Sequence, residues 1–342
     1  MKKIMAFLFF VIMLANTKVF AVDIEIQPTM YSRSNEQNRI WVGSFQLAWN
    51  DFINKIVHNP VRFREGTPIL IQELNRQSFK SDNISDKYYY SYAGKVKKNT
   101  KRVVTRNIRK KFHETSDLLS KLDLKPRNDM FLVYAMLKKD FEFRNSFDKL
   151  GHSNFGLNSV AEYFGIDANS DKRLREGVEV LFYNDINNFA VKLDTTGLDE
   201  VILYKNASNK AFNYIYDDLN KKQKAYKGRN FLNKQDELKI PNITFFEEKL
   251  YEELTNHRIM GTNIIINQAM QTISFDMNNK GVKLKSEAGL TAEVTSLLPP
   301  EERAPRLFYF DNTFVIFLKE KEKQNPYFAL RVNNIELFQN NK

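Results

Sequence analysis

The sequence of 342 residues contains no cysteine, which excludes disulfide bonds, thiol catalysis and zinc–thiolate sites. It is also poor in glycine and proline, with 12 and 9 residues, and no linker rich in these residues divides it. The four histidines are widely separated and form no HxxxH or HExxH pattern, and they are His58, His113, His152 and His257. P-loop, dinucleotide-binding and nucleophile-elbow motifs are absent as well. We therefore expect a protein that is not an enzyme and that uses no cofactor, metal or nucleotide.

Aromatic side chains and positive charge, in contrast, are abundant. Aromatic residues make up 13% of the chain and hydrophobic residues 42%, so a hydrophobic core can supply the stability that disulfides do not. The 52 Lys and Arg residues exceed the 41 Asp and Glu residues, giving a net charge of +11. This charge favours contact with anionic polymers or surfaces but identifies none of them.

The first 21 residues have the order of a secretory signal peptide. Lys2 and Lys3 precede the apolar run "IMAFLFFVIMLA", and "NTKVFA" follows before Val22. The apolar run is shorter than the roughly 20 residues that a membrane-spanning helix needs. We expect cleavage after residues 1–21 and export to the periplasm or the extracellular space, with a membrane anchor as the alternative.

Hydrophobic periodicity predicts a mixed α+β chain. Helical spacing of apolar residues occurs at 42–56, 100–121, 205–226 and 244–254. Strand patterns occur in "MFLVYAML", "NNFAVKLDTT", "EVILYK", "QTISFDMN", "RLFYFDNTFVIFLK" and "PYFALRV". The run 130–137 is continuously apolar, which is typical of a strand buried on both faces.

A basic segment stands at residues 95–111, "KVKKNTKRVVTRNIRKK", with nine Lys or Arg and no acid. In a helix, Val103, Val104 and Ile108 would point inward and the cations outward, forming a ridge for sulfated glycans, nucleic acid or anionic lipid. The alternative is a solvated helix of a basic protein. The candidate anion-binding residues are Lys97, Lys98, Lys101, Arg102, Arg106, Arg109 and Lys110.

Residues 282–294 alternate strictly between two sets of side chains. One set is small or apolar, and the other contains the charges of Lys283, Lys285, Glu287 and Glu293. Pro299 and Pro300 end the pattern, because proline cannot donate to a strand ladder. On periodicity alone, the simplest interpretation is a β-hairpin that turns at 278–281.

The C-terminal third resembles a serpin. "IIINQAMQTISFDMNNKG" looks like the strand that leads into the serpin hinge, with Gly281 at the hinge glycine, and "FDNTFVIFLKEKEKQNPYFALRV" looks like the strand pair after the reactive loop. "MFLVYAMLKKDFEFRNSF", "NNFAVKLDTTGLDEVILYK" and "LKIPNITFFEEKLYEEL" resemble earlier serpin segments in the family order. The resemblance covers residues 107–338, whereas residues 22–106 are short for the family and are expected to be a divergent helical part. The chain thus resembles an atypical, bacterial-type serpin.

The resemblance implies one α+β domain at 22–342, with helices packed around a large central mixed sheet and smaller barrel-like sheets. It also implies a monomer whose bait loop, residues 281–307, is attacked by a serine protease. After cleavage the loop would insert into the central sheet. The implied hinge residues are Gly281, Val282, Leu284, Ser286 and Ala288. Leu284 is bulkier than the family usually has there, and overpacking of this kind typically costs about 1–3 kcal/mol.

The resemblance leaves the cleaved bond open. Counting forward from Gly281 gives the bond after Thr295, whereas counting back from Phe314 gives the region of Arg303. Recognition at an arginine implies a protease that cleaves after basic residues, and recognition at Thr295 or Leu298 implies an elastase-like protease. The candidate recognition residues are Thr295, Ser296, Leu298, Arg303 and Arg306.

Two alternatives to an inhibitor remain. The first is a serpin-like protein whose loop never inserts and which binds an anionic polymer or surface through 95–111. The second is an unrelated exported binding domain with a similar β-rich pattern.

Overall fold

A computed structural model of the chain describes residues 24–125, 130–284 and 305–339. The expected signal peptide lies outside these residues, as do the loop candidates Ser286, Ala288, Thr295, Ser296, Leu298 and Arg303. Within the described part, no helix is both long enough and apolar enough to cross a membrane.

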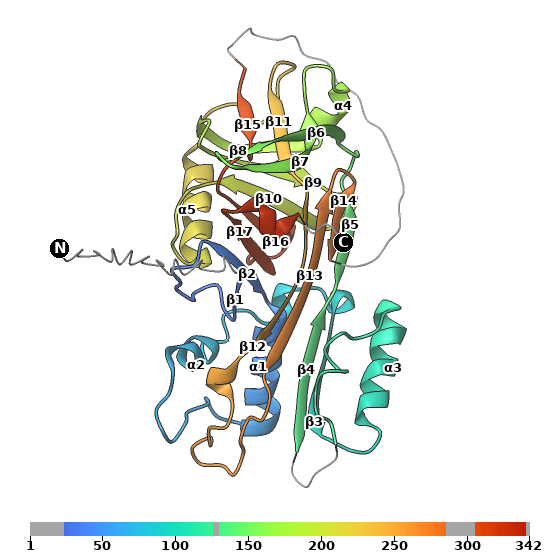
Figure 1. Cartoon of the computed structure of the whole chain (residues 1–342), viewed down its shortest axis with the longest axis vertical. Helices are drawn as coiled ribbons and strands as arrows, with labels where there is room; N and C mark the ends of the chain where they lie inside the picture. The colour runs from blue at the N-terminus through green and yellow to red at the C-terminus, as the bar shows by residue number, and fades with distance from the viewer. Residues whose placement is uncertain (1–23, 126–129, 285–304, 340–342) are drawn as a thin grey trace, which may run out of the picture.

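The largest sheet has seven strands and supplies a larger share of the core than any other sheet (Figure 1). Its order is β1 (Ile24–Gln27), β2 (Asn38–Val42), β17 (Phe328–Val332), β16 (Phe314–Glu320), β10 (Asp199–Lys205), β9 (Asn188–Asp194) and β8 (Val178–Asp185). Only the β1–β2 pair is parallel. Helix α5 (Phe212–Ala225) packs on this sheet through Phe212 and Tyr216, whose rings both contact Phe317.

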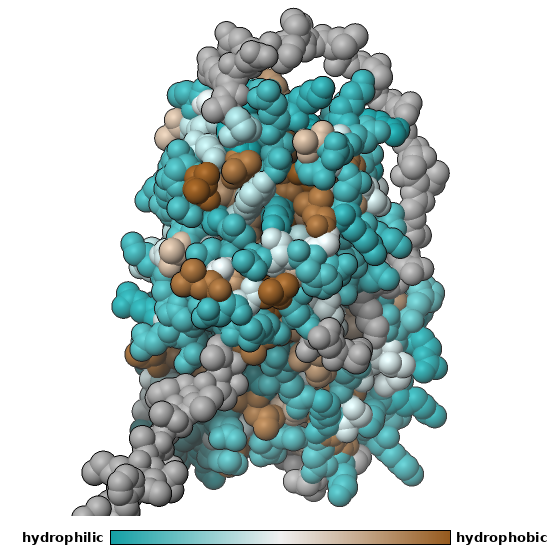
Figure 2. All heavy atoms as spheres, turned by 45° about the horizontal axis from the view of Figure 1, so that its top comes forward, coloured by the Kyte–Doolittle hydropathy of each residue, from teal (hydrophilic) through white to brown (hydrophobic). Residues whose placement is uncertain are grey.

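A four-stranded sheet lies at one end of the molecule (Figure 1). Its order is β15 (Leu307–Tyr309), β11 (Glu237–Pro241), β7 (Ser159–Ile166) and β6 (Asp148–Phe155). Helix α4 (Lys172–Glu176) follows β7 in the chain. Figure 2 turns this end toward the viewer and shows a mostly hydrophilic face on which apolar patches are small and separate. Separate apolar patches are ordinary on protein surfaces and indicate no large docking face.

The third sheet is divided, and we call its two parts together the split sheet. One part has the order β12 (Ile243–Leu250), β13 (Met270–Asn278), β14 (Gly281–Leu284) and β5 (Lys139–Glu142). The other part pairs β3 (Tyr89–Lys95) with β4 (Phe131–Leu137), and only Lys138 separates β4 from β5. The strands β4 and β5 therefore run as one line along both parts (Figure 1).

Short helices surround the split sheet. They are α1 (Ser44–Phe52), continued by a π-helix (Ile53–Val57), α2 (Ile69–Leu74) and α3 (Thr100–Phe112). The described residues also contain four 3₁₀ turns, at Ser81–Asn83, Asp86–Tyr88, Glu252–Leu254 and Ile335–Phe338.

The α+β class and a large mixed sheet with smaller sheets are confirmed, but several expected elements are wrong. Residues 244–254 were expected to be helical, yet Ile243–Leu250 is strand β12, because eight residues of this segment pair with β13. The helix expected at 100–121 ends at Phe112, where His113 takes a left-handed conformation with φ of 58°. The N-terminal part is not only helical, since it contributes β1, β2 and β3. Strand β4 is not buried on both faces, since only Leu132 and Tyr134 of its seven residues are buried and the cleft described below lies along it.

Candidate functional site: an open cleft below the hinge strand

Strand β14 carries the hinge residues and has a partner strand on each side. It pairs antiparallel with β13 and with β5, so Val282 lies opposite both Met277 and Phe141. Val282 is fully buried and Lys283 is exposed, in agreement with the first steps of the predicted alternation. The described part of the hinge is therefore already a strand of the sheet.

Gly281 is required by a close approach of two backbones. A Cβ atom at this position would lie 2.3 Å from the carbonyl oxygen of Phe141 and 2.7 Å from the Cα atom of Glu142. Any larger residue would push β14 away from β5, so only glycine fits without displacement of backbone. Glycine at position 281 thus has a steric basis in the structure.

The turn before β14 is bound to the chain after β5. The backbone N–H of Phe143 donates to the carbonyl of Lys280 at 2.9 Å, and that of Phe147 donates to the carbonyl of Asn279 at 2.8 Å. The side-chain amide of Asn279 returns a bond to the carbonyl of Phe147 at 3.1 Å. These bonds fix the point at which β14 enters the sheet.

The other end of the loop is held by Arg306. Its guanidinium donates to Asp236 at 2.8 Å and to the carbonyls of Arg229 and Phe231 at 2.9 and 2.6 Å. Burial alone would raise the pKa of Asp236, but the bonds from Arg306 and from the backbone N–H of Asn233 hold it below its ordinary value. Because its donors are already bound within the fold, Arg306 in this arrangement ties down the chain and is not presented to a protease, contrary to the recognition role considered for it.

An apolar cleft of about 490 Å³ opens between β4 and β13. In the described chain, β4 pairs only with β3. Residues 270–275 of β13 pair only with β12. Two strand edges thus face each other without a strand between them. Strand β14 lies between β13 and β5 (Figure 1). No described strand takes the corresponding place between β13 and β4, where the cleft lies.

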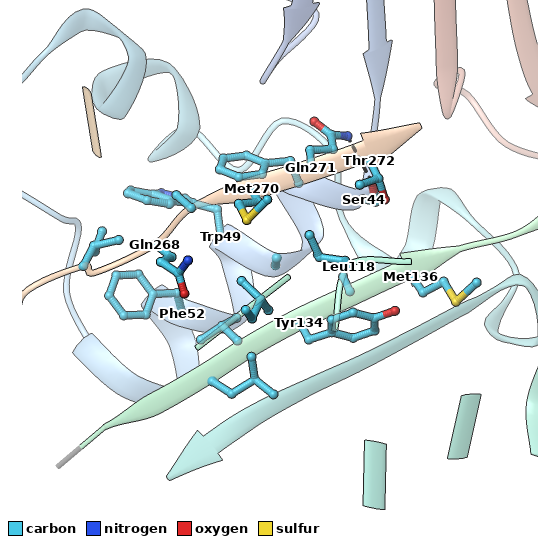
Figure 3. A pocket seen from close by; sticks show the side chains of 18 of the residues that line it. Ser44, Trp49, Phe52, Leu118, Tyr134, Met136, Gln268, Met270, Gln271 and Thr272 are labelled. Carbon is cyan, nitrogen blue, oxygen red and sulfur yellow. Dashed lines mark hydrogen bonds between the residues drawn. The ribbon is translucent and has the colours of Figure 1, made fainter. Parts of the chain in front are cut away.

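The walls of the cleft come from four separate parts of the chain. Trp49 and Phe52 of α1 line it together with residues of β4, β13 and the segment 116–124 (Figure 3). Apolar side chains make up most of the lining, and polar and charged groups such as Asp117, Asp123 and Gln268 make up the rest. The amide of Gln271 donates to the hydroxyl of Ser44 at 3.1 Å.

A buried ionic cluster stands where β14 ends. The register places Leu284 opposite Lys139, whose fully buried ammonium lies 2.7 Å from Asp199 and 2.5 Å from Glu320. The hydroxyl of Tyr327 also donates to Asp199, at 2.9 Å. This cluster joins β5 of the split sheet to β10 and β16 of the seven-stranded sheet.

The two carboxyl groups of this cluster are shifted in opposite directions. Burial raises the pKa of Asp199. Burial alone would also raise the pKa of Glu320, but bonds from Lys139 and Ser85 hold it below its ordinary value. Sequence reasoning missed this cluster, and the only local signal is a lysine pair inside the apolar run "MFLVYAMLKKDFEF".

The predicted basic ridge is present on α3 and lies apart from the cleft's inner walls. Val104 and Ile108 are fully buried, and Val103 is half-buried, as the helical pattern predicts. All seven candidate anion-binding residues are exposed, and none of them forms an ion pair within the described parts of the chain. The residues are Lys97, Lys98, Lys101, Arg102, Arg106, Arg109 and Lys110.

Comparison with known proteins finds similarity only in structure. The chain matches no protein-family model and no curated protein. Among solved structures it is similar to Serpin48, a highly specific serpin in the insect Tenebrio molitor, with 13% identity and a TM-score of 0.45 over 90% of this chain and 95% of that chain. It is also similar to thyroxine-binding globulin in complex with thyroxine, with 12% identity and a TM-score of 0.43 over 68% and 64% of the two chains.

Proposed function

We propose that the protein presents its loop as bait to a serine protease and that the cut end of the loop enters the cleft as a new strand. The observation that carries this proposal is the position of β14, which occupies the top of a gap that continues below it as an open cleft. Addition of a strand to exposed sheet edges is driven by main-chain hydrogen bonds.

The register of β14 supports a specific fit. Leu284 lies opposite Lys139 of β5, and Lys283 lies opposite Asp276 of β13. If the strand continued in this register, Ser286 would lie opposite Leu137 of β4 and Ile273 of β13. In the same register Ala288 would lie opposite Ala135 and Gln271. Ile273 and Gln271 are buried, so the small residues of the loop would enter on the core side of the sheet.

The bulk of Leu284 does not oppose this step. Leu284 is already a residue of β14, and its backbone already pairs with Lys139. The residues that would enter after cleavage therefore begin at 285, and the small residues Ser286 and Ala288 supply the inward positions. Each new main-chain bond adds a net stabilisation of about 0.5–1.5 kcal/mol, so a fully paired inserted strand would make the cut protein more stable than the intact one.

The test is the melting temperature before and after limited cleavage with elastase or trypsin, with the cut located within 285–304 by mass spectrometry. The proposal expects a rise after cleavage. Ala288→Arg would place a charge on the core side and abolish the rise, whereas the matched variant Glu287→Arg, on the opposite face, would preserve it. A cut wild-type chain that melts no higher than the intact chain contradicts insertion.

A second candidate function is binding of an anionic polymer or surface through α3. The seven exposed cations without ion pairs favour it, because unpaired surface cations attract polyanions in a salt-dependent way. Retention on immobilised dextran sulfate should fall in the variant Arg102→Gln, Arg106→Gln, Arg109→Gln. The control with Lys221→Gln and Lys224→Gln on α5 should elute as the wild type does. Equal elution of both variants contradicts the ridge.

The proposal includes export, because the order of charged, apolar and small residues in 1–21 is that of a signal peptide. N-terminal sequencing of the protein from its native host should give a first residue near Val22. A first residue of Met1 contradicts cleavage.

A further inference from the structure

Strand β3 has a partner strand on one side only. It pairs antiparallel with β4 along its whole length, and with no other strand of the described chain. Figure 1 shows β4 on one side of β3 and no strand on the other. Because the cleft lies beyond β4, the outer edge of β3 is separate from it.

The hydrogen bonds identify the groups along this outer edge. The backbone N–H of Lys138 donates to the carbonyl of Tyr88 at 2.8 Å, so β3 is bonded to β4 through its even-numbered residues. The N–H groups of Ser91 and Ala93 therefore point outward, as do the carbonyls of both residues and of Tyr89. Within the described residues none of these groups has a hydrogen-bond partner. We call this set of groups the open edge.

The two faces of β3 are covered, but the open edge is not. Tyr90 and Tyr92 pack against a cluster that includes apolar residues of α3. On the opposite face, β4 packs through Val133 against a cluster that includes residues of α1. Ser91 and Ala93 have small side chains, yet both are only half-buried. Their exposure therefore lies at the edge, where an added strand would pair.

Strand β3 also lacks the features that prevent edge strands from pairing. Natural edge strands are commonly very short or bulged, or they carry proline or a central charge. Strand β3 has seven residues, no proline, a regular register with β4, and a single charge at its last residue, Lys95. Strands β6 and β8 also stand at the edges of their sheets, and both have bulges. An edge without such protection is suited to accept a further strand.

The surroundings of the open edge are strongly basic. Residues 87–111 contain ten Lys or Arg and no acid. The acid just before this run, Asp86, is already paired with Lys111 at 3.1 Å. Three exposed lysines flank β3 without an ion pair in the described chain, and they are Lys87, Lys97 and Lys98. The edge would therefore repel a second copy of itself and attract a segment that carries Asp or Glu.

We propose that the open edge of β3 is a docking site for an extended acidic segment of a partner protein, which pairs with Ser91 and Ala93 as an added strand. Main-chain hydrogen bonds supply affinity, and the flanking lysines select negative side chains. This site goes beyond both the cleft and the cations of α3, because it requires a peptide main chain. A sulfated polymer has none and could contact only the cations.

The test measures the binding of a short fluorescein-labelled peptide, in which Glu and Val alternate, to the full chain by fluorescence anisotropy. One control peptide has Lys in place of Glu. A second keeps Glu but carries a methyl group on every main-chain nitrogen, so it cannot donate hydrogen bonds. Ser91→Pro removes an outward N–H and leaves the bonds to β4 in place, since proline is tolerated where the N–H of an edge strand faces solvent. Ser91→Thr is the matched control, and the melting temperature of each variant checks its folding.

Ser91→Pro should bind the Glu–Val peptide at least about tenfold more weakly, whereas Ser91→Thr should bind it as the wild type does. Both control peptides should bind the wild type at least about tenfold more weakly. In the free wild type, NMR should show rapid hydrogen exchange at Ser91 and Ala93, and the Glu–Val peptide should slow it. The amides of Tyr90 and Tyr92 should exchange slowly in both states. These exchange rates and the methylated peptide test the site even if Ser91→Pro does not fold.

Three results overturn the proposal. Slow exchange of Ser91 and Ala93 in the free protein would mean that the edge is not open. Binding that falls in the variant Arg102→Gln, Arg106→Gln, Arg109→Gln but not in Ser91→Pro would mean contact with cations alone. Dimerisation in sedimentation that is lost in Ser91→Pro would assign the edge to a second copy of the chain.

Discussion

The seven-stranded sheet and the split sheet differ in how completely their strands are paired. In the seven-stranded sheet each strand is bonded to its neighbour, and Phe314 through Leu318 of β16 are consecutive residues that are all fully buried. That pattern is typical of a strand covered on both faces. In the split sheet, β4 and β13 each leave an edge facing the cleft. The side chains of β13 alternate between buried and more exposed, and only two of the seven in β4 are buried.

The difference separates two physical roles. The seven-stranded sheet has no gap between neighbouring strands, so another strand could pair with it only at its edges, β1 and β8. The split sheet has two strand edges without a strand between them and an apolar cavity beneath, so it can gain both hydrogen bonds and buried surface. Substitutions in the two regions, and at the links between them, should therefore have different consequences.

The largest effect is expected at Lys139, which links the two sheets. Lys139→Met leaves Asp199 and Glu320 buried together without their cation, and breaking a buried pair in this way typically costs about 3–5 kcal/mol. Urea unfolding measures the loss. The triple variant that adds Asp199→Asn and Glu320→Gln should recover part of it, and a single variant as stable as the wild type contradicts the linking role.

The next effect is expected at the link between the loop and the four-stranded sheet. Asp236→Asn removes the charge that Arg306 binds, and a hydrogen bond to a charged group is typically worth about 1.5–3 kcal/mol. Because the folded protein holds the pKa of Asp236 below its ordinary value of 3.8, its contribution is present above that pH and is lost as the pH falls below it.

Melting temperatures of the wild type and Asp236→Asn from pH 2 to pH 7 test this sign. The two curves should be farthest apart near pH 7 and should converge in acid. A separation that grows toward acid is the opposite of the expected result.

Much of the seven-stranded sheet could be predicted from sequence because its strands are continuous apolar runs, as in "FVIFLK". Strand β13 could be predicted as well, because apolar side chains alternate in "QTISFDMN". Strand β12 could not, since Phe245, Phe246 and Leu250 fit helical spacing as well as a strand. Pairing of this segment with β13, more than twenty residues later, decides its conformation.

The cleft and its neighbours depend on contacts that no local pattern records. The cleft is the absence of pairing between β4 and β13, which lie far apart in the chain. The ionic cluster collects Lys139, Asp199 and Glu320 from three separate strands. The sequence made Arg306 a candidate for recognition by a protease, because its partner Asp236 is 70 residues away and no local pattern indicates their contact.

A smaller effect is expected from Gly281→Val, at the top of the cleft. The new side chain would collide with the carbonyl of Phe141, and relief by a local backbone shift typically costs about 1–3 kcal/mol. Gly197→Val is the control, because no atom lies within 4 Å of the Cβ position there. Thermal unfolding should show a loss for Gly281→Val alone, and the cut form of this variant should gain less stability than the cut wild type.

The smallest effect is expected at Tyr134 of β4, which joins the split sheet to Ser116 in the segment 114–124. Tyr134→Phe removes the hydrogen bond to Ser116, which is typically worth about 0.5–1.5 kcal/mol. Burial raises the pKa of Tyr134 to about 12, so the neutral hydroxyl favours the folded state. That contribution is complete below the ordinary value of 10 and is lost as the pH rises from 10 through 12.

Tyr216 of helix α5, which packs on the seven-stranded sheet, provides the comparison, because burial raises its pKa to about 12 as well. Urea unfolding between pH 7 and pH 11 should show that both tyrosine-to-phenylalanine variants approach the wild type as the pH rises. Only Tyr134→Phe should also increase hydrogen exchange in 114–124, since Tyr216 bonds instead to the carbonyl of Gln324 at 3.4 Å. Equal exchange in the two variants would mean that the protection of residues 114–124 from hydrogen exchange does not depend on Tyr134.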